Sequence, residues 1–518
     1  MKRRNFLKIA PTAAMAYLIN GLPVKALAAG PLLQLLAKQT AASGRVMVLI
    51  QLVGGNDGLN TIIPLDQYDA LSTARKNILI PEEKVLKLRG TYPTGLHPAM
   101  TGLRDMFNND MMNIVQSVSY ANPNYSHFRA TDIWLTGAGS SEYLNDGWLG
   151  RYLAEENPDY PQTLPSDPLA IQIGATVSTA LQGPNVNMGM AVTSIENFYN
   201  IVNNEVTPAP ATPAGHELTF LRFIAQQTQT YTSALQSAAG NAQNLSQLYP
   251  KNNSLAEQLK IVARLIAGGL QTPVYMVSMG GFDTHAGQVD STDTTTGAHA
   301  VLLSKLSEAV TAFFDDCRLL KTDDRVAAMT FSEFGRRIIS NGGLGTDHGT
   351  AAPVMVFGKY VNPAILGTNP VIPDKATVRD DLKMQFDFRA VYASVLGDWF
   401  GAPKDIWTEA LRDYYSILPI FRKDDKTILT ERDEDPLSQN YPNPFSDKTC
   451  ISFVSQGGNV RIVLYDAAGR AVKTIVDKDY DAGYNHVYMY RDGLTAGNYV
   501  YKFMNAGKSA SRKMSIIG

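Results

Sequence analysis

The chain has 518 residues, of which 45% are hydrophobic and 18% are charged. This composition is typical of globular proteins and excludes a disordered or fibrous chain, and the length allows about two to four domains. There are 46 lysine and arginine residues against 48 acidic ones, a net charge of -2, so no basic excess points to a nucleic acid partner. Two cysteines are too few for a disulfide framework or an all-cysteine zinc site, so any metal must be held by Asp, Glu and His.

Residues 1–29 have the anatomy of an export signal. A basic start is followed by a short apolar run and by the small-residue sequence Ala26-Leu27-Ala28. The pair Arg3-Arg4, followed by Phe6-Leu7-Lys8, resembles a twin-arginine signal; the alternative is an ordinary secretory signal with a chance arginine pair. This apolar run is too short to span a membrane, and no later stretch has about 20 continuous apolar residues. We therefore expect no transmembrane segment in the mature protein.

The composition changes toward the C-terminus. A charge-dense segment at 421–436 predicts a solvated linker. After it, residues 437–518 contain short alternating segments separated by turn residues, which predicts a small all-β sandwich. The predicted strands lie at 450–454, 460–465, 471–476, 486–490 and 498–503.

Three motifs in this last region, at residues 440–445, 465–470 and 497–501, resemble the C-terminal sorting domain of the type IX secretion system. The resemblance implies a Bacteroidota-type bacterium and two export partners, the twin-arginine translocase and the type IX secretion system. The expected location is the periplasm in transit and then the cell surface or the extracellular space. The alternative interpretation is an adhesion or carbohydrate-binding sandwich.

Residues 43–420 are predicted to form one large domain. The segment 45–53 is nearly all apolar, which predicts a strand buried on both faces of a parallel sheet. Similar strands are predicted at 273–279 and 325–331, and the helical patterns between them, such as 299–320, indicate a doubly wound α/β domain. The first strand ends in Gly-Gly-Asn-Asp-Gly, which presents Asp57 at the sheet edge where ligands bind in such folds.

Acidic and histidine side chains follow these strands. Carboxylates mixed with neutral imidazoles suit a divalent cation, which would polarise an anionic substrate. For any single acid the alternative is a helix cap or a salt-bridged loop residue. The sequence leaves zinc, manganese and calcium open as the cation. The predicted metal ligands are Asp57, Asp283, His285, Glu333 and His348, with Asp347 as a further candidate.

Ser126 and His127 are the catalytic candidates. Ser126 lies where a helix is expected to begin, so its hydroxyl is either a helix N-cap or an exposed nucleophile beside a helix N-terminus. His127 is either a second functional group or a hydrogen-bonded loop residue. The remaining histidines are expected to be structural or exposed: His97, His216, His299 and His486.

The middle region resembles the secreted bacterial family known as domain of unknown function 1501, which is grouped with the alkaline phosphatase superfamily. The motifs that carry the resemblance lie at residues 49–64, 126–128, 146–151, 280–285, 330–336 and 345–350. The resemblance implies an alkaline-phosphatase-like α/β fold, a mainly parallel sheet flanked by helices. It also implies one or two metals and a Ser, Thr or modified Cys nucleophile.

Carried over residue by residue, the resemblance makes Asp57 the metal aspartate of the first strand and Ser126 the residue near the nucleophile position. Asp283 and His285 resemble the paired Asp and His of one metal site, with a shorter gap between them. The segment 330–335 takes the place of a Thr-Ser-Asp-His-Gly motif. There Glu333 replaces the aspartate and Phe334 replaces a histidine ligand, while His348 resembles the last metal histidine.

These features predict an exported, metal-dependent hydrolase of phosphate or sulfate esters, in which Ser126 attacks phosphorus or sulfur. The expected substrate is a small anionic ester or a sulfated or phosphorylated glycan. Arg336 or Arg337 either pairs with the anion or is a solvated helix residue. A rival hypothesis, favoured by Phe334, is a non-catalytic surface protein that binds a glycan or a partner on the same fold. A further alternative is hydrolysis by a metal-bound water without a covalent step.

Overall fold

The computed structural model describes residues 17–19, 22–24, 44–90, 92–193, 231–422, 437, 440, 443–480 and 483–517. The chain divides into two units, Met1–Gly44 and Arg45–Gly518. In the first unit the described residues form two short antiparallel strands, β1 (Tyr17–Ile19) and β2 (Leu22–Val24). The rest of the predicted export signal, His216 and most of the predicted linker lie outside the described residues.

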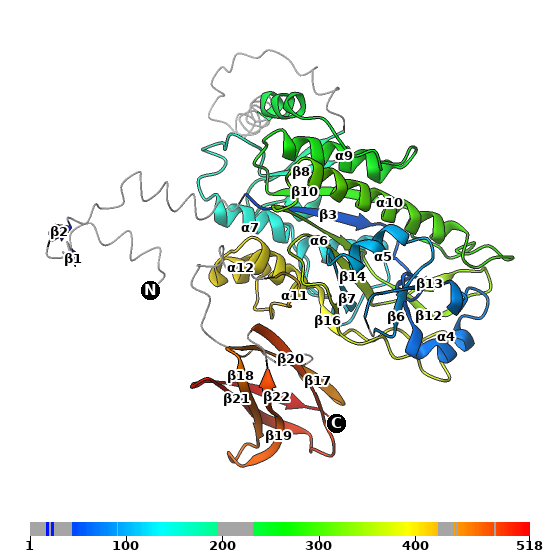
Figure 1. The fold of residues 1–518 in the computed structure, drawn as a ribbon, viewed down its shortest axis with the longest axis vertical. Coiled ribbons are helices and arrows are strands. Elements are labelled where there is room, and N and C mark those ends of the chain that lie inside the picture. Colours follow the sequence, from blue (N-terminus) through cyan, green and yellow to red (C-terminus); the bar gives the residue numbers. More distant parts are fainter. Residues whose placement is uncertain are drawn as a thin grey trace. The chain divides into compact units, whose positions relative to one another are not determined.

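A nine-stranded sheet organises the α/β region (Figure 1). Its order is β15-β7-β14-β11-β3-β10-β8-β9, and β16 also pairs with β7. Strand β14 runs antiparallel to both of its neighbours, and the other pairings are parallel. The predicted fold class, a mainly parallel sheet flanked by helices, is confirmed. The strands are β3 (Val46–Leu52), β7 (Met112–Ser119), β8 (Ala170–Ile173), β9 (Met190–Val192), β10 (Val274–Met279), β11 (Val326–Phe331), β14 (Ala352–Gly358), β15 (Ile365–Leu366) and β16 (Phe386–Asp387).

Helices cover both faces of this sheet, and the side chains of β3 show why. Val48 and Ile50 pack into the core under one group of helices, while Met47 and Leu49 pack into the core on the opposite face, as the twofold period of a strand requires. Both faces are therefore apolar, which explains the continuous hydrophobic run in the sequence. The first group comprises α5 (Thr101–Asn108), α9 (Ser254–Ala267) and α10 (Ala298–Leu319), and the second α6 (His127–Thr136), α7 (Trp148–Glu156), α11 (Phe388–Ser394) and α12 (Lys404–Leu411).

The topology brings several loops to one edge of the sheet. Strands β3, β10 and β11 are parallel, so their carboxyl ends meet at the same edge. Strand β7 runs in the same direction, because both β7 and β11 are antiparallel to β14. For the same reason the segment that precedes β14 reaches this edge. Loops from five strands therefore surround one position, as is usual for the ligand site of an open α/β sheet.

Smaller elements flank this edge. The turn after β3 leads into α3 (Gly58–Thr61), and a hairpin of β12 (Arg336–Ser340) and β13 (Thr346–His348) follows β11. A satellite apolar cluster that includes Leu59, Leu71 and Ile338 packs these elements together. The neighbouring short elements are β4 (Ile62–Pro64), α4 (Tyr68–Ala74), β5 (Leu86–Lys87) and β6 (Thr94–Leu96).

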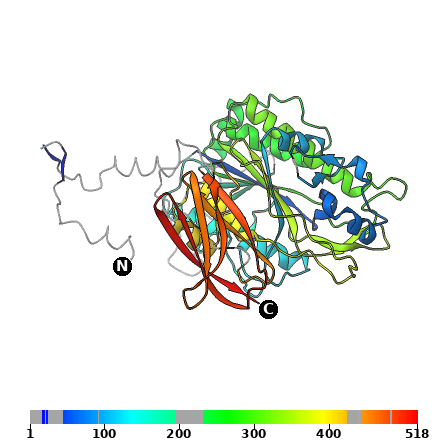
Figure 2. The same ribbon diagram turned by 60° about the horizontal axis from the view of Figure 1, so that its bottom comes forward.

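The C-terminal region is all-β, as predicted, and forms two antiparallel sheets with a core of their own (Figure 2). One sheet pairs β17 (Lys448–Ser455) with β20 (Gly483–Tyr490). The other has the order β19-β18-β21-β22, with β18 at Gly458–Tyr465, β19 at Ala471–Tyr480, β21 at Gly497–Asn505 and β22 at Lys508–Ile516. Strand β22 was not among the predicted strands. Its exposed positions are basic or small, and it has few large apolar residues. The alternation of apolar and polar residues that indicates a strand is therefore weak in this segment.

None of the helices in the described part of the chain has the length and apolar character needed to cross a bilayer.

Candidate functional site

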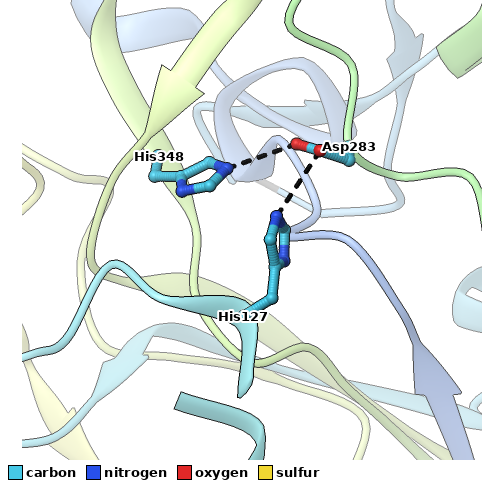
Figure 3. Close-up of side chains that lie close together, drawn as sticks. All are labelled: His127, Asp283 and His348. Carbon is cyan, nitrogen blue, oxygen red and sulfur yellow. Dashed lines mark hydrogen bonds and ion pairs between the residues drawn. The ribbon is translucent and has the colours of Figure 1, made fainter. Parts of the chain in front are cut away.

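Three side chains from separate segments converge at the carboxyl edge of the sheet (Figure 3). His127 begins α6, Asp283 lies in the loop after β10, and His348 ends β13. His127 Nε2 lies 3.5 Å from Asp283 Oδ2, and His348 Nε2 lies 3.3 Å from Asp283 Oδ1. One nitrogen or oxygen atom from each side chain lies within 4.8 Å of those of the other two. We call these residues the His127–Asp283–His348 cluster.

The second nitrogen of each histidine has its own partner. His127 Nδ1 lies 2.8 Å from Oε1 of Glu333, and His348 Nδ1 lies 2.8 Å from the carbonyl oxygen of Tyr125. Because a carbonyl oxygen can only accept, His348 donates its Nδ1 proton and directs the Nε2 lone pair at the cluster. A carboxylate acceptor favours the same tautomer for His127, whose Nε2 is buried without a hydrogen bond. This pairing is the usual environment of metal-bound histidines.

The cluster fits a small divalent cation. Around a tetrahedral zinc ion with bonds of about 2.0–2.1 Å, neighbouring ligand atoms lie about 3.4 Å apart. His348 Nε2 lies 3.3 Å from Oδ1 of Asp283 and His127 Nε2 lies 3.5 Å from Oδ2, so each imidazole nitrogen is near that distance from one of the two oxygens. Two neutral imidazoles and one carboxylate are also a ligand set that zinc accepts.

Arg336 fixes the carboxylate of Asp283. Its Nη2 donates to Asp283 Oδ1 at 2.7 Å, and His285 Nδ1 lies 2.8 Å from the same oxygen. Partial burial acts to raise the pKa of Asp283, but the hydrogen bond and charge of Arg336 outweigh it and lower the pKa to about 2. Asp283 is therefore an anion at any physiological pH, and Oδ2 is the oxygen left facing His127.

Arg336 is buried in β12, so the expectation of a solvated helix residue is wrong. Its buried guanidinium donates to five acceptors within the protein, three of them through Nη2, so its contacts hold loops together rather than face solvent. These acceptors are Asp283 Oδ1 and the carbonyl oxygens of Gly54, Gly55, Phe282 and Thr346. One side chain therefore joins the loops after β3 and β10 to the β12–β13 hairpin.

Phe334 forms the floor of the cluster. Its ring centroid lies 4.9 Å from that of His127 and 4.6 Å from that of His348, and the side chain is buried. Gly55 has φ +81°, and a Cβ there would meet the Phe334 ring at 2.4 Å. Phe334 thus supports the two imidazoles by packing against them.

The other predicted site residues have different surroundings. Glu333 is buried behind His127, and its Oε1 also accepts from the Gly54 amide at 2.8 Å. The half-exposed His285 lies beside the cluster, with its ring 4.6 Å from that of His348. Asp347 is exposed and accepts from Asn341 Nδ2 at 2.9 Å. Ser126 is exposed at the N-cap position of α6 without making a capping hydrogen bond, so its hydroxyl is not used by the helix.

Asp57 does not join the cluster. It is buried, and both of its oxygens lie near Nη1 of Arg75, at 2.6 and 2.9 Å. Gln288 Nε2 donates to Oδ2 at 2.6 Å. Neither Arg75 nor Gln288 lies in a motif that drew attention in the sequence, because each acts through a distant partner that no local spacing reveals.

Two buried histidines, His97 and His299, lie near Asp57, with ring centroids 6.1 Å apart. His299 Nε2 lies 3.0 Å from Asn56 Oδ1, and His97 Nδ1 accepts from the Ala99 amide. Burial lowers the pKa of His97 to about 3 and that of His299 to about 4. Both are therefore neutral in the fold, which agrees with the structural role expected for them.

We expect these two histidines to make the fold less stable in mild acid. Unfolded histidine has a pKa near about 6.5, so below that pH the unfolded chain binds protons that the fold does not, and stability falls as the pH drops toward 4 and 3. The urea midpoint should be lower at about pH 5 than at about pH 7, a range above the titration of most carboxylates. His299→Gln should reduce this difference, and a difference that is unchanged in that variant would contradict the prediction.

Comparison with known families gave two matches. The model described as protein of unknown function (DUF1501) matches residues 209–406, and that of the secretion system C-terminal sorting domain matches residues 439–517. Both predicted resemblances are confirmed. The sorting domain indicates export to the cell surface or the extracellular space. The comparison with curated proteins gave no match.

Solved structures similar to the chain include three proteins at 12% sequence identity. Ps i-CgsB, in complex with k-i-k-neocarrahexaose, has a TM-score of 0.33 over 72% of this chain and 75% of that chain. A protein of the alkaline phosphatase superfamily from Vibrio parahaemolyticus has a TM-score of 0.30, covering 84% and 82% of the two chains. The PsFucS1 sulfatase from Pseudoalteromonas sp. also has a TM-score of 0.30, covering 88% and 87%.

Proposed function

We propose that this exported chain, which carries a DUF1501 domain and a secretion sorting domain, is a hydrolase of phosphate or sulfate esters that depends on a divalent cation held by His127, Asp283 and His348. The observation that supports the proposal most is the cluster itself. Two imidazole lone pairs and an anionic carboxylate oxygen point at one position, and each histidine is oriented by a separate acceptor. This arrangement brings three negatively polarised atoms close together, which a bound cation stabilises.

The cation proposed for the cluster and the residues beside it favour an anionic ester as the substrate. A cation bound there supplies positive charge that polarises an anionic ester and stabilises the charge of the transition state. Arg336 is buried and donates to acceptors within the protein, and Phe334 packs against the inner side of both imidazoles. The substrate therefore approaches from the outer side, where His285 and Ser126 are exposed.

Ser126 is the proposed nucleophile. It precedes His127 directly, at the N-terminus of α6, where the helix dipole favours negative charge on the hydroxyl oxygen. The Ser126 hydroxyl gives up its proton as its oxygen forms a bond to phosphorus or sulfur, and the bond to the ester oxygen breaks. The leaving oxygen takes up one proton in exchange, so the leaving group departs as an alcohol. Water then hydrolyses the serine ester and restores the hydroxyl. The twin-arginine translocase and the type IX system are the proposed export partners.

Metal analysis of the purified protein combined with a panel of phosphate and sulfate esters tests this function. We expect a bound divalent cation and turnover of at least one ester class that chelation abolishes. Ser126→Ala should lower kcat by at least about 100-fold, since it removes the nucleophile, while leaving the metal content unchanged. Thr350, whose hydroxyl bonds to the Leu382 carbonyl oxygen, offers a matched control in Thr350→Val, which should keep most of the activity.

Each part of the proposal has its own contrary result. Metal-free protein whose stability is unchanged by chelation would remove the cation from the proposal. Bound metal with no turnover of any ester would favour the non-catalytic binding protein. Full activity in Ser126→Ala would show that water, rather than serine, attacks the ester.

A further inference from the structure

The position beside Asp57 is already filled by a cation from the chain itself. Asp57 is 1% exposed and the Arg75 side chain is 0% exposed, so the two charges are buried together. Arg75 Nη1 lies 2.6 Å from Oδ2 and 2.9 Å from Oδ1 of Asp57. This one nitrogen therefore contacts both carboxylate oxygens, as a metal ion bound by a bidentate carboxylate would. Burial acts to raise the pKa of Asp57, but Arg75 outweighs it and lowers the pKa, so Asp57 is an anion.

All three nitrogens of the Arg75 guanidinium donate hydrogen bonds within the protein. Its Nε donates to the Ile338 carbonyl oxygen at 2.8 Å, its Nη2 to the Arg337 carbonyl oxygen at 2.6 Å, and its Nη1 also to Asn60 Oδ1 at 3.2 Å. These partners belong to β12 and α3, so moving Arg75 away would leave buried carbonyl groups without donors. A divalent cation at Asp57 would have to displace Arg75 or lie beside its buried positive charge. Both would cost free energy.

A second side chain, Gln288, also donates to Asp57. Gln288 donates to Oδ2 at 2.6 Å, and Gln288 Oε1 in turn accepts from Thr346 at 2.8 Å and from Thr284 at 3.1 Å. Thr284 and Thr346 each adjoin the cluster in sequence, next to Asp283 and two residues before His348. The Asp57 network therefore supports the loops that carry the cluster rather than adding a ligand to it.

We infer that Arg75 takes the place of a cation at Asp57, so that the chain holds a single divalent cation, at the His127–Asp283–His348 cluster. The second half of this inference rests on the proposed function. Arg336 does the corresponding work at Asp283, where its buried guanidinium occupies Oδ1 and leaves Oδ2 for binding. The buried Asp57 and the half-exposed Asp283 are thus each paired with one buried arginine.

Zinc stoichiometry and affinity of the full chain test the inference, with native mass spectrometry for the count and chelator competition for the affinity. Wild type should bind one zinc ion. Asp57→Asn should still bind one, with an affinity within about threefold of wild type, whereas Asp283→Asn should lose at least about 100-fold. Two zinc ions in wild type, or a loss in Asp57→Asn as large as that in Asp283→Asn, would overturn the inference.

Arg75→Ala provides a second comparison that does not depend on the cluster. The variant leaves the Asp57 carboxylate buried without a cation, so millimolar zinc should raise its melting temperature more than that of the Asp57→Asn/Arg75→Ala double variant. Equal shifts in the two variants would contradict the role of Arg75. If wild type binds no zinc, the proposed function fails, and this comparison alone decides whether Arg75 replaces a cation. If Arg75→Ala does not fold, the Asp57→Asn titration decides.

Discussion

His127→Ala and His348→Ala are each expected to weaken zinc binding by at least about 100-fold, more than the 10–100-fold typical for loss of an outer partner. Each removes an imidazole nitrogen of the cluster, which faces Asp283 at 3.5 Å in His127 and at 3.3 Å in His348. Competition with a chromophoric chelator at fixed pH measures the affinity. Hydrolysis of any ester that wild type cleaves should fall in parallel.

His285→Ala is the matched control for these variants. Its ring is also an imidazole beside Asp283, with Nδ1 2.8 Å from Oδ1, but it is not part of the cluster. We expect its zinc affinity to stay within about tenfold of wild type. Should His285→Ala lose as much affinity as His348→Ala, the ligand set would include Asp283, His285 and His348, three of the ligands predicted from sequence, and His127 would have another role.

Arg336→Ala is expected to lower the free energy of unfolding by about 3–5 kcal/mol, because it removes the donor from several buried carbonyl oxygens, at about 1–3 kcal/mol for each one left unsatisfied. The Arg336 side chain is 0% exposed, and its loss removes a donor from the carbonyl oxygens of Gly54, Gly55 and Thr346. Urea denaturation followed by far-ultraviolet circular dichroism measures the change. Arg336→Lys should recover part of the loss, because it keeps the charge but not the planar fork.

Arg318→Ala serves as the control for this loss. Arg318 also pairs with an aspartate, at 2.7 Å from Asp315, but its side chain is 62% exposed. An exposed pair of this kind contributes little, so we expect a change below about 1 kcal/mol. A similar loss in both variants would mean that Arg336 contributes no more than a surface ion pair, against the role assigned to it here.

The sequence predicted the framework of the site well. The apolar runs that end before Asp57, Asp283 and Glu333 are β3, β10 and β11, three neighbouring parallel strands. Their period and length are local properties, so they can be recognised without knowledge of the fold. Parallel pairing then brings the three following loops to one edge, as predicted.

The composition of the cluster was harder to predict. His127 was assigned a catalytic or structural role, although its Nε2 faces Asp283, while Asp57 was expected among the metal ligands. The difference arises from partners far away in the chain. Arg75 follows Asp57 by 18 residues, and Glu333 lies 206 residues from His127. Position at a strand end shows that a side chain reaches the edge, but not whether another residue already occupies it.

By itself, the sequence determined the all-β sorting region and the α/β domain with acids and histidines at its strand ends, because motifs, hydrophobic period and turn residues are encoded locally. The tertiary structure decided which of those side chains face one another. Arg75 and Arg336 reach their acids only after β12 packs beside the loops of β3 and β10. Charge pairing between residues that are far apart in the sequence depends on the packed fold. In this protein it pairs Asp57 with Arg75 and so sets Asp57 apart from the His127–Asp283–His348 cluster.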